Sequence, residues 1–592
     1  MNKKIIVFIS LLFLLLNNCA GPVSAITQTE LKSHVRYLAS DRLQGRSPGT
    51  NGDRKAAEYI CSQFKNSMLT LLGDSGFQYF DIITDVSLGH NNSLTIDQIN
   101  FSVGNDFIPL SFSQNTTLTA PIVFVGFGFD FKNDSLSWND YSDVDVTGKW
   151  VLILRGSPDK NNPHGNFSEH SSLRKKVMIA KDHSAAGVVF TSGSEFDESD
   201  TLIPLRYDQS QINVSVPVIH IKREVADLIL YKSCGSLVSL ENTVFEMKER
   251  FKSIELKKNV SVSTTVKYNT VQTQNIVGVL PGIDEQLKNE YVVIGAHYDH
   301  LGYGGEHSGS RRPNHYEIHN GADDNASGVS VMMELAELFS HNKSNKRTLV
   351  FVGFGAEEMG LLGSKYFVKS GIIKNDNIQI MLNMDMVGRL DRKENTISIG
   401  GTHTAVNIES EIETIASKTS LQYTFSPEGY GPSDHSSFYV NDTPVLFFFT
   451  GAHNDYHTPD DDADKINYSG MKVLSQLIYS IADYFSTMDE RLVFQEAGPR
   501  QQEERQRFKV TLGIMPDYTY SATRGLRIDA VLKNKPASIA GLEDGDIIIK
   551  MNGNSVNDIY EYMHRLSEFK SGDEVKVKVV RGKLEKTVIV NF

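Results

Sequence analysis

Between residues 270 and 490, short apolar runs typical of buried strands alternate with segments whose apolar residues recur at helical spacing. This alternation predicts an α/β domain in which a mostly parallel sheet is flanked by helices. In such a domain the functional groups lie just beyond the carboxyl ends of the strands. The expected elements are, in order, strand Tyr291–Ala296, helix Val329–Phe339, strand Thr348–Phe354, helix Leu361–Ser370, strand Ile378–Asn383, strand Pro444–Phe449 and helix Met471–Phe485.

The segments outside this region set the expected domain boundaries. Residues 118–259 hold short β-rich runs separated by loops rich in Asn, Asp and Ser, which predicts a β-rich module inserted into the α/β domain. Residues 491–507 are charged and Gln-rich, as is typical of a linker, and residues 508–592 predict a compact C-terminal unit. The α/β domain is therefore expected to comprise residues 26–117 and 260–490.

The first 25 residues have the pattern of a signal peptide. Two lysines precede the apolar run Ile5–Leu16, which is too short to span a bilayer, and the small residues before Ile26 fit a cleavage site after Ala25. Cys19 offers an alternative, because it stands in a loose lipoprotein box that would attach a lipid anchor. The sequence therefore predicts export, to the periplasm or the medium, with no transmembrane span in the mature chain.

Charge and cysteine content exclude two other classes of protein. The formal net charge of −13 argues against a nucleic-acid partner, which requires clustered Lys and Arg. Beyond the leader only Cys61 and Cys234 remain, so the chain has no disulfide framework.

Side chains able to bind metal follow the strands of the α/β region. A single histidine or acidic pair would usually be structural, but here two histidines and several carboxylates each stand where a strand gives way to a loop. Carboxylates that converge at one end of a sheet repel one another unless cations neutralise them. A mixture of imidazole and carboxylate ligands suits zinc. These residues are His297 and Asp299, Asp324 in the turn Gly321–Gly328, the pair Glu357 and Glu358, Asp385, and His457.

The composition of this set suits two zinc ions. Two ions roughly 3.5–4 Å apart can share a bridging carboxylate, and each then needs one histidine and one further carboxylate. A separate carboxylate must serve as general base, and the adjacent Glu357 and Glu358 meet both needs if one faces the metal and the other the attacking water. Asp299, two residues after His297, is placed to orient that imidazole. The segment between His300 and Asn320 is expected to form a loop flanking the active site.

These motifs resemble metallopeptidase family 28, the co-catalytic zinc aminopeptidases. The matching motifs are His297-x-Asp299, Gly321–Gly328, Glu357-Glu358, Asn383-Met-Asp385, Ser433-Asp-His435 and His457-Thr. The resemblance implies that His297, Asp324 and Asp385 hold one zinc ion, and that Asp324, Glu358 and His457 hold the other. It also implies that Glu357 is the general base and that Tyr430 stabilises the tetrahedral oxyanion. Asn325 differs from many relatives, which carry an aspartate there, but the position is not a ligand.

The flanking modules also resemble known families. Residues 118–259 are similar to a protease-associated domain, on the motifs Trp138–Tyr141, Val146–Ile153, Ala185–Val189 and Val216–His220. Residues 508–592 resemble a PDZ domain, on Ala537–Ile547 and Asn552-Gly553. The resemblance implies that Leu512, Gly513, Ile514 and Met515 form a loop that binds the carboxylate of a peptide C-terminus.

The sequence as a whole predicts an exported aminopeptidase that hydrolyses N-terminal residues from peptides through a metal-bridged water and a glutamate base. Two alternatives stay open. A carboxypeptidase or dipeptidase of the same fold would use the same metals, and a receptor-like binding protein would share the domains without catalysis.

Overall fold

The computed structural model describes residues 25–132, 136–159, 166–167, 170–207, 214–231, 233, 235–247, 250–306, 308–498, 510–516, 525–531, 535–556, 562, 565–566 and 569–592. The predicted leader with Cys19, and Cys234, lie outside these residues. The chain divides into two compact units, one built from residues up to Asp81 and from Gln272 onward, the other from Ile82–Val271. In the described part of the chain, no helix is both long and apolar enough to cross a membrane.

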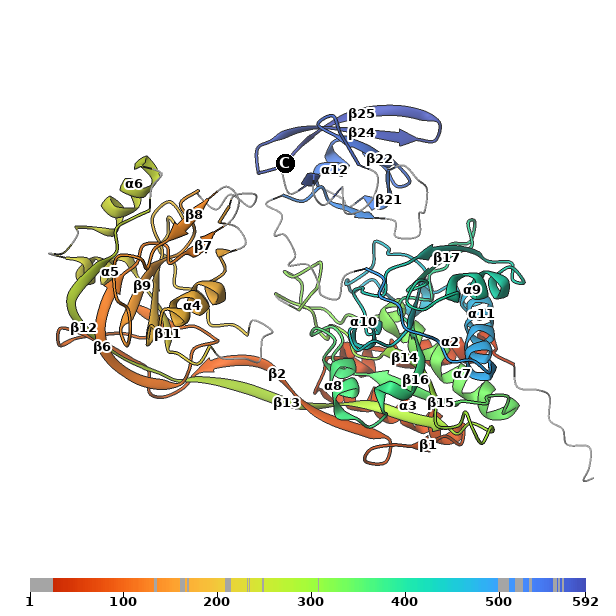
Figure 1. The fold of residues 1–592 in the computed structure, drawn as a ribbon. Coiled ribbons are helices and arrows are strands. Elements are labelled where there is room, and N and C mark those ends of the chain that lie inside the picture. Colours follow the sequence, from red (N-terminus) through yellow and green to blue (C-terminus); the bar gives the residue numbers. More distant parts are fainter. Residues whose placement is uncertain are drawn as a thin grey trace, which may run out of the picture. The chain divides into compact units, whose positions relative to one another are not determined.

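A nine-stranded sheet organises the first unit (Figure 1). At its centre, β15 (Thr348–Phe354), β14 (Tyr291–His297), β16 (Ile378–Met384) and β19 (Val445–Phe449) run parallel in that order. The flanking strands are β1 (Thr70–Leu71), β2 (Phe77–Leu88) and β13 (Val266–Leu280) on the β15 side, and β17 (Thr396–Gly400) and β18 (Gln422–Ser426) on the β19 side. Because β13 and β17 are antiparallel to their inner neighbours, the sheet is mostly rather than entirely parallel.

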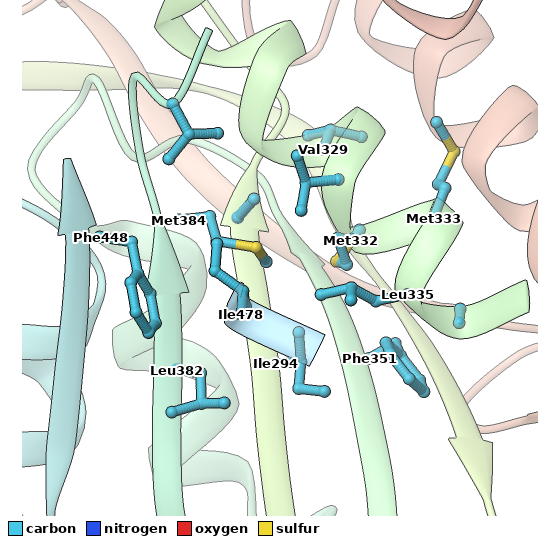
Figure 2. Close-up of a cluster of buried hydrophobic side chains, with 14 of the residues drawn as sticks. Ile294, Val329, Met332, Met333, Leu335, Phe351, Leu382, Met384, Phe448 and Ile478 are labelled. Atoms are coloured by element: carbon cyan, nitrogen blue, oxygen red, sulfur yellow. The ribbon is translucent and has the colours of Figure 1, made fainter. Parts of the chain in front are cut away.

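Helices cover both faces of this sheet, as the alternation of elements predicts. Side chains from one face, including Ile294 and Leu382, form a core with α7 (Gly328–Asn342), where Val329 and Leu335 are fully buried (Figure 2). The same core includes α2 (Gln28–Leu38), α3 (Asn51–Asn66), α9 (Ile408–Ala416) and α11 (Tyr468–Thr487). The alternate side chains of the strands, such as Val293, pack with α8 (Leu362–Ser370) and α10 (His435–Tyr439) on the other face.

The second unit is larger than the predicted 118–259 insert. Its eight-stranded sheet has the order β4-β3-β12-β6-β9-β10-β11-β5. The strands β3 (Ser93–Ile96), β4 (Ile99–Phe101) and β5 (Phe107–Pro109) precede residue 118 and pair into this sheet through β12 and β11. Residues 82–117 were therefore wrongly assigned to the α/β domain. The remaining elements are β6 (Thr116–Phe124), β9 (Trp150–Leu154), β10 (Gly187–Thr191), β11 (Val218–Ile221), β12 (Ile254–Thr264), a hairpin of β7 (Asp130–Lys132) and β8 (Ser137–Asn139), and helices α4 (Leu173–Asp182), α5 (Arg223–Leu230) and α6 (Leu237–Met247).

The predicted linker 491–507 is also wrong in its first half. Residues 491–498 are part of the first unit, because Phe494 bridges to Ala405 and packs at a tilt against Tyr439, and the backbone N–H of Ala497 donates to the Tyr439 hydroxyl. Residues 499–509 lie outside the described residues.

The C-terminal residues form a separate sheet of β20 (Ile514–Pro516), β21 (Leu526–Val531), β22 (Ile547–Met551), β23 (Asn554–Ser555), β24 (Glu574–Arg581) and β25 (Leu584–Asn591), with the short helix α12 (Pro536–Ile539). Its core includes Leu512, Ile528 and Val577, all fully buried.

Candidate metal centre

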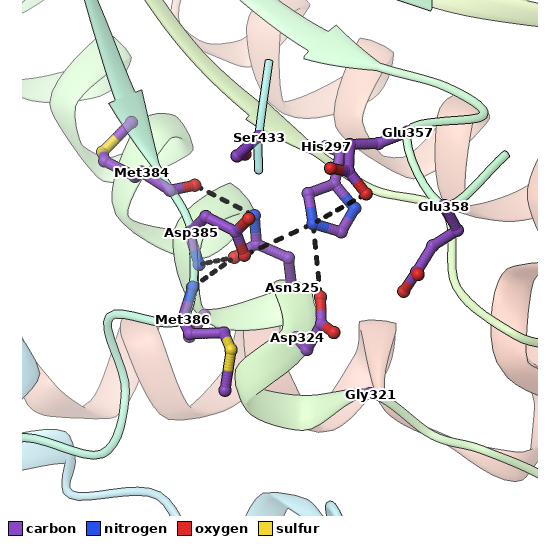
Figure 3. Close-up of polar contacts among 12 residues, drawn as sticks. His297, Gly321, Asp324, Asn325, Glu357, Glu358, Met384, Asp385, Met386 and Ser433 are labelled. Carbon is purple, nitrogen blue, oxygen red and sulfur yellow. Dashed lines mark hydrogen bonds and ion pairs between the residues drawn. The ribbon is translucent and has the colours of Figure 1, made fainter. Parts of the chain in front are cut away.

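The parallel strands end at one edge of the sheet and place the predicted metal-binding side chains there. His297 is the last residue of β14, Glu357 and Glu358 follow β15, and Asp385 follows β16. Asp324 lies in the irregular turn Ala322–Ser327 that leads into α7. Figure 3 shows these side chains converging on one small volume.

Asp324 lies between the two predicted histidine ligands. Its Oδ1 is 3.2 Å from Nε2 of His297, and its Oδ2 is 3.1 Å from Nε2 of His457. Nε2 of His297 is also 3.4 Å from Asp385, and Nε2 of His457 is 3.2 Å from Glu358. The structure therefore brings together both residue sets that the sequence predicts, with Asp324 common to them.

Backbone carbonyls orient both imidazoles. Nδ1 of His457 donates to the carbonyl of Gly309 at 3.0 Å, so this loop residue directs Nε2 toward the carboxylates. Nδ1 of His297 is 3.3 Å from the carbonyl of Asp299. The loop 301–319 thus contributes directly to the geometry of the site, since the N–H of Arg311 also donates to the carbonyl of His457.

Asp299 lies beside His297, as predicted, and also contacts the glutamate pair. Its carboxylate is 3.7 Å from Nδ1 of His297, whereas its two oxygens accept the backbone N–H groups of Glu357, at 3.0 Å, and Glu358, at 3.3 Å. Asp299 therefore positions the glutamate pair as well as lying behind His297.

His300 was missed by the sequence analysis. It is fully buried, and its Nδ1 lies 2.7 Å from Oε1 of Glu358. One possible ligand atom from each of His300, Asp324 and Glu358 lies within 4.8 Å of the other two. A second group of the same kind contains His297, Glu357 and Asp385. The available signal was the position of His300 directly after the His297-x-Asp299 motif.

Asn325 and Ser433 support Asp385. The Asn325 amide donates to the carbonyl of Met384 at 2.9 Å and accepts from the N–H of Met386 at 3.3 Å, so it holds the chain on both sides of Asp385 (Figure 3). The hydroxyl of Ser433 accepts a hydrogen bond from Asn383 at 2.8 Å. An aspartate at position 325 would lack the N–H that donates to Met384.

Sequence profiles of three domain families match this chain. Peptidase family M28 matches residues 275–482, the PA domain matches residues 118–229, and the PDZ domain matches residues 506–592. The chain carries an M28 peptidase domain.

Similar proteins are aminopeptidases and zinc metalloproteases by name. Aminopeptidase YwaD of Bacillus subtilis (strain 168) is 25% identical over 449 residues, which are 74% of this chain and 81% of that protein. A probable zinc metalloprotease of Pyrenophora tritici-repentis is 36% identical over 129 residues, 21% of this chain and 27% of that protein. Among solved structures, an aminopeptidase from Aneurinibacillus sp. strain AM-1 is 22% identical, with 79% of this chain and 96% of that chain covered and a TM-score of 0.45.

The M28 site carries buried negative charge that favours a bound cation. Burial, together with the charges of Glu358, Asp434 and Asp385, raises the pKa of Glu357 well above its ordinary value. Burial opposes a charge on His297, but the carboxylates of Glu357, Asp385, Asp299 and Asp324 together outweigh it and raise the pKa of His297 well above its ordinary value. The buried carboxylates therefore favour positive charge at this site.

The donor atoms fit zinc. Two Nε2 atoms and the oxygens of three carboxylates face one another, and both Nδ1 atoms already lie against backbone carbonyls. Imidazole nitrogens with a carbonyl partner on the other ring atom are the usual form of zinc-binding histidine.

Two tyrosines differ in their contacts with the predicted ligands. Tyr430 is half-buried and packs against the apolar cluster that includes Phe438, and in the described residues its hydroxyl contacts none of the predicted ligands. Tyr456, which the sequence analysis did not single out, stacks on His457 with ring centroids 3.8 Å apart. Burial and the charges of Asp324 and Glu358 raise the pKa of Tyr456 well above its ordinary value.

The predicted PDZ carboxylate loop lies at the start of the C-terminal sheet. Leu512 is buried, Gly513 has φ +76°, and Ile514 and Met515 belong to β20, which pairs with β21. The N–H of Gly513 donates to the Thr511 hydroxyl at 3.1 Å.

Proposed function

We propose that this chain is a two-zinc aminopeptidase that removes residues from the N-terminus of peptides. The shared position of Asp324, with one oxygen toward His297 and the other toward His457, is the observation that carries the proposal. The M28 match and the names of the relatives support it.

In this proposal His297, Asp324 and Asp385 hold one zinc ion, and Asp324, Glu358 and His457 hold the other. When bound, the ions supply Lewis acidity to the scissile carbonyl and to the attacking water. Asp299 holds the glutamate pair in place through their backbone N–H groups, and His300 holds the carboxylate of Glu358.

Glu357 moves the proton. Its carboxylate is 3.9 Å from Nε2 of His297 and is largely buried, so it lies beside the predicted ligands without belonging to either ligand set. Glu357 takes a proton from the attacking water and then gives it to the departing amine. Tyr430 donates a hydrogen bond to the oxyanion once the substrate is bound. We further propose that the mature protein is exported, and that the PDZ loop Leu512–Met515 binds a peptide C-terminus.

The decisive experiment measures release of free amino acids from a panel of aminoacyl anilides and short peptides, with N-acetylated substrates as the matched control. Hydrolysis that is lost on acetylation and on chelation, and regained with zinc, is the expected result. Cleavage restricted to blocked or C-terminal substrates would transfer the function to a sister carboxypeptidase or dipeptidase. A zinc-loaded protein that hydrolyses nothing in the panel would overturn the proposal.

A further inference from the structure

The buried arginine Arg46 lies beneath the metal centre. It ends the segment Asp41–Arg46, which joins α2 to α3, and only 1% of it is exposed. The segment packs so closely that a Cβ atom on Gly45, which has φ +69°, would stand 2.4 Å from the carbonyl oxygen of Gly302. Arg46 is therefore held in a fixed position against the loops that follow β14 and precede Asp324.

The guanidinium joins two segments that carry predicted metal ligands. Its Nε donates to the carbonyl of Tyr298 at 2.7 Å, within the segment His297–His300. Its other nitrogens donate to the carbonyls of Asn320, at 2.7 Å, and Gly321, at 3.0 Å, directly before the turn that holds Asp324. A further bond reaches the carbonyl of Leu38 in α2 at 2.5 Å.

The charge of Arg46 is balanced by the site rather than by a direct ion pair. All four acceptors are neutral carbonyls. Burial lowers the pKa of Arg46 to about 10, and the carboxylates that oppose this effect are Asp324, Asp299, Asp461 and Glu358. A buried cation is costly unless anions compensate it. Two of these compensating anions, Asp324 and Glu358, are predicted metal ligands.

We propose that Arg46 is a positioning residue of the metal centre: its planar set of N–H donors fixes the segment Tyr298–His300 relative to the segment Asn320–Asp324, so that His297 and Asp324 are in register before metal binds. This inference rests on the proposed function only in taking the site to bind zinc. A lysine at position 46 would keep the charge, but it lacks the rigid fork that reaches both segments at once.

Zinc affinity of folded protein tests the proposal, measured by competition with a chelator. Arg46→Lys and Arg46→Gln are expected to weaken zinc binding by about 10- to 100-fold, as loss of supporting contacts behind metal ligands does. The absorption spectrum of cobalt-substituted protein is expected to change as well, because the ligand geometry loosens.

Arg347 provides a matched control. It is also fully buried and donates to backbone carbonyls, including that of Glu490 at 3.1 Å, but it stands just before β15, at the opposite end of that strand from Glu357. Arg347→Lys is expected to lower the unfolding temperature yet leave zinc affinity and the cobalt spectrum unchanged. Wild-type zinc affinity and cobalt spectrum in folded Arg46→Lys, or an equal loss of affinity in Arg347→Lys, would overturn the proposal.

Wild-type protein gives a second test that does not depend on the folding of variants. If Arg46 holds the two segments together, peptides covering residues 298–302 and 320–326 stay protected from hydrogen exchange after zinc is removed. Free exchange in both segments, with the interior of β14 still protected, would contradict the inference. Because these readouts require no substrate, they remain valid if the chain proves not to be an aminopeptidase.

Discussion

Oδ2 of Asp461 accepts the backbone N–H of Asp324 at 3.1 Å. The same oxygen accepts the N–H of Asp323 at 2.8 Å, and the other oxygen is 3.2 Å from the guanidinium of Arg389. Asp461 stands four residues after His457. The same loop therefore supplies the predicted ligand His457 and the carboxylate of Asp461, which holds the turn that carries Asp324. A change in this loop would displace both His457 and Asp324.

Replacing Asp461 is expected to weaken metal binding. Asp461→Ala removes the acceptor for both N–H groups of the Asp323–Asp324 turn, so zinc affinity should fall by about 10- to 100-fold. The adjacent Asp460, whose carboxylate pairs with Arg312 instead, gives the control variant Asp460→Ala. Chelator competition checks both, and equal affinities for the two variants would refute this supporting role of Asp461.

Glu357→Gln is expected to lower kcat strongly without loss of zinc. Removing a general base costs about 10²- to 10⁴-fold in rate, and Glu357 is in neither predicted ligand set. Metal analysis should find close to two zinc ions per chain, and kcat should fall by that factor. Loss of one ion would instead make Glu357 a ligand, in line with its grouping with His297 and Asp385.

Substitutions at Asp324 and His457 are expected to differ in zinc content. Asp324→Ala removes the carboxylate shared by both ions, so both should bind weakly. His457→Ala removes a ligand from one set only, so about one ion should remain. Metal analysis after dialysis at matched zinc concentration distinguishes the two, and identical contents would mean that Asp324 is not shared.

His300 is expected to act on the site through Glu358. His300→Gln can still donate a hydrogen bond to the Glu358 carboxylate, whereas His300→Ala cannot. Zinc affinity should therefore fall in the alanine variant and recover in the glutamine variant. If both variants lose an ion equally, the imidazole itself is a ligand and the positioning role is wrong.

The second unit is expected to gain stability at alkaline pH through Lys176. Its ammonium is fully buried and donates to the carbonyls of Leu154 and Gly156, and burial lowers its pKa from 10.5 to about 7. Below pH 7 the folded state bears the full cost of this buried charge. Between pH 7 and 10.5 the folded state releases the proton while the unfolded chain retains it, so stability rises with pH.

Comparison with Lys176→Met isolates this effect. The free energy of unfolding of the variant should exceed that of wild type most at pH 7, and the difference should shrink toward pH 10. The neighbouring Asp140, whose pKa burial raises to about 7, titrates below this window. Both tryptophans of the chain, Trp138 and Trp150, lie in this unit, so their fluorescence during urea unfolding reports on it selectively. A pH-independent difference, like that expected for the exposed Lys175→Met control, would contradict the prediction.

Local patterns in the sequence were sufficient to predict the elements of the α/β domain. The expected strand Thr348–Phe354 is identical to β15, and the expected helix Leu361–Ser370 differs from α8 by one residue. Continuous apolar runs and helical periodicity arise from burial on the two faces of a sheet, so they are visible without any long-range information. The order of His297, Asp324, the glutamate pair, Asp385 and His457 could likewise be read directly, because each follows a recognisable element.

The tertiary structure decided the relationships between residues that are far apart in the chain. The strands β3 to β5 are too short to reveal their domain by local pattern, and only their pairing with β12 and β11 assigns them to the second unit. Nothing local in the charged and Gln-rich segment after residue 490 shows that Phe494 packs near Tyr439. His300, Asp461 and Arg46 acquire their positions at the metal centre through contacts with Glu358, Asp324 and Gly321 that span long stretches of chain. The sequence by itself thus predicted which groups take part in the chemistry, because metal-binding residue types recur where strands and turns end. Only the packed fold decided which groups hold them, because a supporting contact depends on proximity in space and leaves no pattern along the chain.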